Sequence, residues 1–291
     1  MKNIELAKLI MNLHTEVLLD GLMFPEGPRW HQDKLWFTDQ HAKNIKTVDI
    51  NGNSQLIAEL SDLPGGLGWL PDGRLLVVAM CQRHLLVLEQ EQLKLFADLS
   101  QHASFHCNDL LVDRQGRCYV GNFGYDLHGG APLSNAEIIL VSAGEPPKVV
   151  STEVVFPNGM VLTPDGKTLI VAETFAARLS SFSVQADGSL GSRQLWADLG
   201  DAFPDGICLD QENGIWVACP NTGDVIRVEQ GGRVTDTVKT IGNPYACMLG
   251  GAERKQLFVL SSETDDPKQA VIMQSGRIEC VAVDIPGAGL P

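Results

Sequence analysis

The feature that most constrains the fold is a hairpin pattern that recurs six times along the chain. Its clearest copy is residues 156–174, FPNGMVLTPDGKTLIVAET, where Asn158 precedes an apolar run, a Pro-Asp-Gly turn and a second, β-rich run. Two such runs joined by a turn of this composition are typical of a β-hairpin. Five other stretches follow the same order: FPEGPRWHQDKLWFTD, PGGLGWLPDGRLLVVA, HCNDLLVDRQGRCYVGN, FPDGICLDQENGIWVAC and NPYACMLGGAERKQLFVLS.

The spacing of these copies predicts the architecture. We call the residue that opens the first strand of each copy the mouth position, and the intervals between successive mouth positions are 39, 43, 50, 47 and 40 residues. Periods of about 40 to 50 residues with short strands are the signature of propeller blades, and runs with helical periodicity are largely missing. The sequence therefore predicts an all-β, six-bladed β-propeller with six mouth residues: Glu26, Gly65, Asn108, Asn158, Asp205 and Tyr245.

The ends of the chain predict how the ring of blades closes. Residues 15–22, TEVLLDGL, are predicted to be a strand that pairs with the C-terminal stretch AVIMQSGRIECVAVDI in one blade, which would protect both edges. Residues 1–14 are expected to form a short helix or an N-terminal arm. No linker or change in composition divides the chain, so residues 1–291 are predicted to be a single domain.

Charge and cysteine content exclude several classes of partner. The chain has 22 Lys and Arg against 36 Asp and Glu, and a net charge of −14 would repel the phosphate backbone of nucleic acid. Seven cysteines without a CxxC pair indicate reduced thiols, and the opening MKNIELAKLIMNL lacks the architecture of a signal peptide. No apolar run is long enough for a spanning helix. These features predict a cytoplasmic protein that binds neither nucleic acid nor membrane, and they leave its oligomeric state open.

The mouth positions predict a cluster of oxygen donors. The innermost strands of a propeller face the central axis, so residues in equivalent mouth positions converge at one end of the channel. An isolated Asn-Gly or Asp-Gly pair usually marks a turn, but the Pro-Glu-Gly context of Glu26 matches Pro-Asn-Gly and Pro-Asp-Gly in the same register. A hard divalent cation suits such oxygen donors and would hold two carboxylates together. The predicted donors are two carboxylates and two carboxamides: Glu26, Asp205, Asn108 and Asn158.

Four of these stretches also carry a family resemblance. PEGPRW with Glu26, the Asn108-Asp109 pair, PNGMVLTPDGKTLIVAE and PDGICLD make nearly the whole chain similar to the SMP-30/gluconolactonase/regucalcin-like family of six-bladed propeller hydrolases. The resemblance implies that Glu26, Asn158 and Asp205 bind the metal and that Asp205 is also the general base. It implies that Asn108 binds the substrate or completes the metal shell. The expected cation is Ca²⁺, with Mg²⁺, Mn²⁺ and Zn²⁺ as alternatives.

His106 departs from the pattern of that family. Members that cleave sugar lactones typically carry Arg two residues before the Asn-Asp pair, and here a titratable ring replaces that bidentate donor. Because His106 lies two residues from Asn108 on an inner strand, it is expected to face the same channel. We expect it to contact the substrate or to act as an auxiliary acid or base, with a packed or solvated side chain as the alternative.

A Gly-rich stretch after the third copy, GNFGYDLHGGAP, lies within the longest interval between mouth positions, 50 residues, and predicts a loop over the mouth. Family members place a substrate-contacting acid near Asp126, which the resemblance carries over to this loop. An ordinary exposed loop is the alternative. The loop supplies four further candidates for contact with the substrate: Asn122, Tyr125, Asp126 and His128. Packing between blades accounts for the aromatic residues that precede three mouth positions: Phe24, Phe156 and Phe203.

These features predict a divalent-metal-dependent hydrolase that acts on a small-molecule lactone or related ester. The cation would polarise the carbonyl while Asp205 activates water, with Asn108 orienting the carbonyl and His106 protonating the departing oxygen. One alternative uses the same metal site for non-hydrolytic chemistry, such as a lyase or isomerase reaction on an oxygenated small molecule. The other is a non-catalytic calcium-binding propeller, although a binding scaffold has no need of carboxylates in one register.

Overall fold

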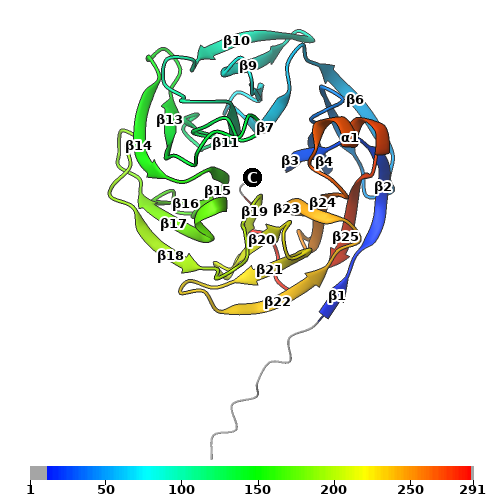
Figure 1. Cartoon of the computed structure of the whole chain (residues 1–291). Helices are drawn as coiled ribbons and strands as arrows, with labels where there is room; N and C mark the ends of the chain where they lie inside the picture. Colours follow the sequence, from blue (N-terminus) through cyan, green and yellow to red (C-terminus); the bar gives the residue numbers. More distant parts are fainter. Residues whose placement is uncertain (1–11, 290–291) are drawn as a thin grey trace, which may run out of the picture.

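Six β-sheets surround a central axis in the computed structural model, which describes residues 12–289 (Figure 1). Each sheet contains a blade of four antiparallel strands, and one sheet has a fifth strand at its outer edge. The strand nearest the axis is the first strand of a recurring hairpin. This arrangement confirms the predicted six-bladed β-propeller. The first three blades are β3 (Pro25–His31), β4 (Lys34–Asp39), β5 (Asn44–Val48) and β6 (Ser54–Glu59); β7 (Pro64–Trp69), β8 (Leu75–Ala79), β9 (His84–Glu89) and β10 (Gln92–Asp98); and β11 (Cys107–Val112), β12 (Cys118–Asn122), β13 (Ala136–Val141) and β14 (Lys148–Val154).

The remaining three blades repeat this order around the ring. A one-turn 3-10 helix, η1 (Thr174–Ala176), follows the second strand of the fourth blade. The sixth blade takes its outermost strand from the other end of the chain, β2 (Glu16–Leu22). The other strands are β15 (Pro157–Leu162), β16 (Thr168–Glu173), β17 (Arg178–Ser183) and β18 (Gln194–Asp198); β19 (Ile207–Leu209), β20 (Ile215–Cys219), β21 (Asp224–Val228) and β22 (Val234–Lys239); and β23 (Asn243–Gly250), β24 (Gln256–Ser262) and β25 (Gly276–Ala282).

The ring closes as the sequence predicts, with β2 antiparallel to β25 in the sixth blade. A further strand, β1 (Asn12–His14), pairs parallel with β22 of the fifth blade, and the rest of the predicted arm lies outside the described residues. The prediction for the C-terminal stretch is wrong at its start, because residues 270–273 belong to helix α1 (Pro267–Met273). Asp266 caps this helix and Pro267 suits its first turn. Within residues 12–289, no helix is long and apolar enough to cross a membrane.

Glycines that follow the mouth residues let the inner strands of neighbouring blades approach one another. A Cβ atom on Gly159 would lie 2.5 Å from the backbone nitrogen of Ile207, and one on Gly206 would lie 2.7 Å from the Cα atom of Ala246. Each of these contacts joins one blade to the next. The glycine of the Pro-Asn-Gly and Pro-Asp-Gly motifs is therefore required by packing around the axis. The residue before it remains available for function.

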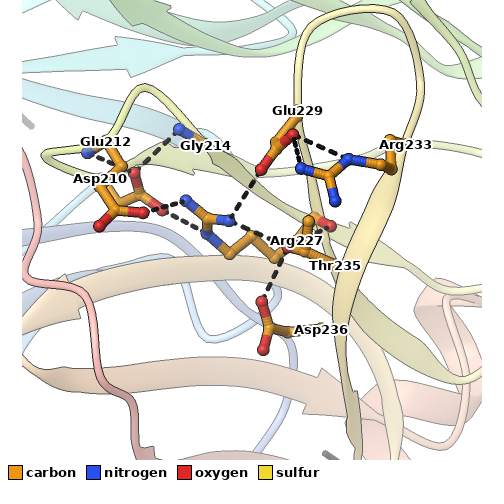
Figure 2. Close-up of polar contacts among 8 residues, drawn as sticks. All are labelled: Asp210, Glu212, Gly214, Arg227, Glu229, Arg233, Thr235 and Asp236. Atoms are coloured by element: carbon orange, nitrogen blue, oxygen red, sulfur yellow. Dashed lines mark hydrogen bonds and ion pairs between the residues drawn. The ribbon is translucent and has the colours of Figure 1, made fainter. Parts of the chain in front are cut away.

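Paired charges stabilise the blades at the end opposite the mouth positions. In the fifth blade, Arg227 on β21 lies between Asp210 and Glu229 (Figure 2), and its Nε donates to Asp210 Oδ2 at 2.6 Å. Arg227 and Asp210 are both buried, so each needs the other as a partner. Arg117 and Asp113 form a similar pair in the third blade, with 2.6 Å between Nε and Oδ2. These groups have a structural role and are separate from the mouth.

All seven cysteines are free thiols. Five of them are buried, and burial raises the pKa of Cys107, Cys118 and Cys219 to about 12. A thiol with such a pKa stays protonated at pH 7 and is a poor nucleophile. These cysteines therefore pack as small apolar side chains between strands.

Candidate functional site

The mouth residues converge on one cavity of about 390 Å³. Strands β3, β11, β15 and β23 each begin at the cavity, and the segment before β19 reaches it as well. Gly65 on β7 has no side chain to contribute, and Leu63 and Met80 of the same blade line the wall instead. Residues at equivalent positions of the sequence repeat therefore lie close together in the structure. The mouth residues that line the cavity are Glu26, Asn108, Asn158, Asp205 and Tyr245.

A chain of hydrogen bonds links two amide side chains, in the third and fourth blades, to the backbone of the fifth. Asn108 Nδ2 donates to Asn158 Oδ1 at 3.1 Å, and Asn158 Nδ2 donates to Thr174 Oγ1 at 3.3 Å. The Thr174 hydroxyl donates in turn to the backbone carbonyl of Pro204 at 2.8 Å, next to Asp205. Asn158 and Thr174 are both buried, so this chain holds the Asn158 amide in one orientation.

Carboxyl groups gather at the floor of the cavity, the side formed by Glu26, Asn108, Asn158 and Asp205. Burial, and then the neighbouring Asp109, raises the pKa of Glu26 to about 8. Burial and the charges of Glu26 and Asp109 raise the pKa of Asp205 well above its ordinary value, and a hydrogen bond from Asn158 opposes this shift. Three carboxylates therefore share this region with one guanidinium, that of the buried Arg29. In their ionised forms they leave an excess of two negative charges, which a divalent cation would balance.

The donor atoms on the floor fit a hard cation. Glu26 and Asp205 present carboxylate oxygens, Asn108 and Asn158 present carboxamide oxygens, and no thiol lies among the described residues that line the cavity. Within residues 12–289, no three His, Cys, Asp or Glu side chains form a metal-binding group. A cation at this place would therefore use amide oxygens as well as the two carboxylates. Such a mixed oxygen set is one that Ca²⁺ accepts.

Three histidines line the wall of the cavity: His41, His106 and His128. His106 faces the cavity, and its ring stacks on Phe105 with 4.1 Å between centroids. The ring of His41 lies 5.4 Å from that of Phe24. Burial lowers the pKa of both His41 and His106 below the ordinary value, so both imidazoles are neutral at pH 7. They can exchange hydrogen bonds with a ligand without carrying positive charge.

Three of the four candidates from the Gly-rich stretch, Asn122, Tyr125 and Asp126, do not line the cavity. Asn122 is fully buried, and its Nδ2 donates to Glu137 Oε2 at 3.0 Å. Tyr125 packs against aromatic rings beside the cavity, and Asp126 Oδ1 accepts a hydrogen bond at 2.8 Å from a backbone N–H three residues later. Of the four candidates from this loop, His128 lines the cavity. A substrate contact by Asn122, Tyr125 or Asp126 remains a prediction.

A second register supplies wall residues that the sequence analysis missed. The second strand of each hairpin runs antiparallel to the first, so the residues that follow it return to the mouth. The repeat pattern, extended by one strand, could have identified them. Phe24, Phe156 and Phe203 also line the cavity, so their assignment to packing alone was incomplete. The residues of the second register are Gln40, His41, Met80, Phe123, Thr174, Phe175, Pro220, Asn221 and Asp265.

The fold and this site define a six-bladed propeller with a small-molecule cavity at one end of its axis. The family description "SMP-30/Gluconolactonase/LRE-like region" matches residues 24–263 of the chain. The chain therefore belongs to the SMP-30/gluconolactonase/LRE-like family, which confirms the resemblance seen in its motifs.

Two relatives match the chain over most of their lengths. The chain is 24% identical over 279 residues to 6-deoxy-6-sulfogluconolactonase from Pseudomonas putida, covering 91% of this chain and 93% of that protein. It is 28% identical over 261 residues to regucalcin from Gallus gallus, covering 84% of each. Its structure is similar to that of regucalcin from Agrobacterium tumefaciens, described as a calcium-binding protein, with a TM-score of 0.81, 21% identity and coverage of 97% and 99%.

Proposed function

We propose that the protein hydrolyses a lactone or related carboxylic ester with the help of one divalent cation, with Ca²⁺ as the first candidate. The observation that carries this proposal is the convergence of Glu26, Asn158 and Asp205 on a cavity floor whose carboxyl groups, in their ionised forms, carry excess negative charge. Family membership and similarity to a protein named 6-deoxy-6-sulfogluconolactonase support the choice of reaction. Similarity to a regucalcin described as calcium-binding supports the choice of cation.

Glu26, Asn158 and Asp205 would hold the cation, with Asn108 beside them. When bound, a divalent cation at this place polarises an ester carbonyl and stabilises the negative charge that develops on its oxygen. Asn158 reaches the floor in one orientation because Asn108 and Thr174 bind both ends of its amide. The donors are therefore organised before any ligand arrives.

Asp205 is the proposed general base. It lies at the cavity surface, and the raised pKa of its carboxyl group means that it binds a proton more strongly than an ordinary Asp. Contact with a cation weakens a carboxylate as a base, so one Asp205 oxygen must stay free to take the proton of the attacking water. Asn108 retains an N–H group that can orient the substrate, and His106 offers a neutral imidazole to it.

The test of this proposal is Asp205→Asn, assayed on sugar lactones, aliphatic lactones and aryl esters after chelation and re-addition of Ca²⁺, Mg²⁺, Mn²⁺ or Zn²⁺. Loss of a general base predicts a decrease in kcat of about 10²- to 10⁴-fold. Cation binding, measured by calorimetry, should largely survive, because the amide oxygen can still ligate. Asp20→Asn changes an exposed Asp on the outer strand β2 and is the matched control. Normal turnover in Asp205→Asn would refute the role of Asp205.

The same panel separates the hydrolase from its two alternatives. Hydrolysis in H₂¹⁸O must place the label in the carboxylate product. Turnover of an oxygenated substrate without incorporation of solvent oxygen would instead favour lyase or isomerase chemistry at this site. Cation binding with no turnover of any lactone or ester would favour a calcium-binding propeller.

A further inference from the structure

The wall of the cavity differs in character from its floor. The oxygen donors lie on the floor, whereas the wall above them is mainly aromatic and aliphatic. Pockets of this kind bind through apolar contact and use a few polar groups to orient the ligand. The aromatic residues come from both registers of the repeat and from five of the six blades: Phe24, Phe123, Phe156, Phe175, Phe203 and Tyr245.

Four of these rings form a continuous arc over three blades. Phe123 stacks on Phe156 with 4.6 Å between centroids, and Phe156 meets Phe175 edge-on at 4.8 Å. Phe175 lies 6.1 Å from Phe203, also edge-on. Phe175 and Phe203 remain 36% and 38% exposed although both line the cavity. Their exposed faces add little to the protein core and would be covered by an apolar ligand.

The charges around the cavity disfavour an anionic ligand. The described residues that line it include neither Lys nor Arg, and their acidic members are Glu26, Asp205 and Asp265. A sulfonate, phosphate or carboxylate on the substrate would find no guanidinium or ammonium partner here. Where the hydroxyl groups of a sugar lactone lie against the phenyl rings of the arc, they would lose water and gain no hydrogen bond from those rings. The acidic residues of the lining therefore disfavour an anionic substrate, and the phenyl rings of the arc disfavour hydroxyl groups on the part of the substrate that they contact.

Resting on the hydrolase function proposed above, we propose that the substrate is an uncharged lactone or ester that carries an apolar aryl substituent. The carbonyl lies on the floor near Asp205, and the aryl group lies against the arc formed by Phe123, Phe156, Phe175 and Phe203. A volume of about 390 Å³ is near the lower end of the range of about 300 to 1,000 Å³ for small-molecule pockets. The substrate is therefore a compact molecule of one or two rings.

The first experiment compares three lactones under identical conditions with the activating cation present: γ-phenyl-γ-butyrolactone, γ-butyrolactone and D-glucono-1,5-lactone. Contact of the phenyl group with the arc predicts a kcat/KM for the phenyl lactone at least about tenfold above that of each of the others. A glucono-lactone turned over as well as the phenyl lactone would overturn the proposal.

The second experiment removes rings of the arc one at a time. Phe175→Ser and Phe203→Ser change partly exposed side chains, and each should reduce the kcat/KM ratio of phenyl lactone to γ-butyrolactone about tenfold. Phe175→Leu should retain a larger ratio than Phe175→Ser, because it keeps an apolar contact. Leu195→Ser is the matched control, since Leu195 is 59% exposed on β18 and lies outside the cavity wall. Equal ratios in all four variants would overturn the assignment of the arc.

A binding measurement distinguishes failure of this inference from failure of the hydrolase proposal. If no lactone is cleaved, the hydrolase function fails, and titration calorimetry with γ-phenyl-γ-butyrolactone still tests the arc. Saturable binding that Phe175→Ser and Phe203→Ser each weaken about tenfold supports an aryl-binding wall. Absence of binding to the correctly folded, cation-loaded protein overturns it.

Discussion

Asn108 in the third blade donates a hydrogen bond to Asn158 in the fourth, with 3.1 Å between Nδ2 and Oδ1 across 50 positions of sequence. The contact joins the first strands of adjacent blades at their mouth positions. Asn158 in turn donates a hydrogen bond to the Thr174 hydroxyl, which donates to the backbone carbonyl of Pro204, the residue before Asp205. Two of the residues proposed to bind the cation, Asn158 and Asp205, are therefore linked through Thr174 and the backbone of Pro204.

Asn158→Ala is expected to damage the site more than the fold. The change leaves the Asn108 Nδ2 group without its acceptor, which predicts a loss of about 1 to 3 kcal/mol in the free energy of unfolding. Cation affinity should fall at least about tenfold and lactone turnover with it. Calorimetry and urea denaturation measure the two effects. The control is Asn51→Ala in an exposed turn, and an unchanged affinity in Asn158→Ala would exclude Asn158 as a ligand.

Removal of the charge of Glu26 should separate cation binding from stability. Without a cation, burial and then the neighbouring Asp109 disfavour the ionised form of Glu26 and raise its pKa to about 8. Glu26→Gln should therefore be more stable than the wild type in the presence of a chelator, by on the order of 2 kcal/mol. Added Ca²⁺ at about 100 times Kd should stabilise the wild type by about 2.7 kcal/mol and leave the variant unchanged.

Thermal unfolding with and without Ca²⁺ measures both effects of the Glu26 substitution. Glu59→Gln changes an exposed Glu on β6 of the same blade and should behave like the wild type. Equal stabilisation of Glu26→Gln and the wild type by Ca²⁺ would place the cation elsewhere.

His106→Arg tests why the chain departs from the sugar-lactone pattern of its family. His106 lines a cavity whose described lining contains no Lys or Arg, so the variant would introduce a guanidinium there. The kcat/KM ratio of an anionic lactone to a neutral one should rise about tenfold, because the new side chain can pair with a carboxylate or sulfonate. His14→Arg adds the same charge at an exposed position of β1 and is the control. A ratio that does not rise would show that residue 106 does not set charge preference.

The repeat predicts both the fold and the cavity floor because one periodic pattern specifies both. Equivalent positions in equivalent hairpins must meet around an axis, so the side chains of Glu26, Asn158 and Asp205 can be placed before any coordinates are known. The strand at residues 15–22 is predictable for a related reason, since an open ring would leave two edges unpaired. In both cases the sequence pattern of the strand and the need to close the ring of blades lead to the same prediction.

The aromatic wall could not be predicted in the same way. Phe156 is 5% exposed and both packs between blades and faces the cavity, so its position in the sequence does not distinguish the two roles. Phe175 lies on η1, which interrupts the repeat, and its orientation depends on contacts with Phe156 and Phe203. Asn122 shows the opposite case, because this polar residue at the end of β12 donates a hydrogen bond to Glu137 and does not line the cavity. Such orientations are set by tertiary contacts, which a single sequence does not specify.

Glu279 on β25 contacts both segments that meet where the ring of blades closes. Its carboxylate is fully buried and accepts hydrogen bonds from the backbone N–H groups of Ile241 at 2.9 Å and Gly242 at 3.1 Å. It also accepts hydrogen bonds from the hydroxyl groups of Ser261 and Thr15, and Thr15 directly precedes β2. One side chain therefore ties the N-terminal strand to the segment that leads into the sixth blade.

Glu279→Ala should weaken ring closure, because it leaves several buried donors without an acceptor. The expected loss is about 3 kcal/mol or more of the free energy of unfolding, measured in urea. Glu279→Gln keeps one acceptor oxygen and should lose less, and Glu16→Ala on the exposed face of β2 should change stability little. If Glu279→Ala unfolds at the same urea concentration as Glu16→Ala, then closure depends on the β2–β25 pairing alone and the buried carboxylate adds nothing to it.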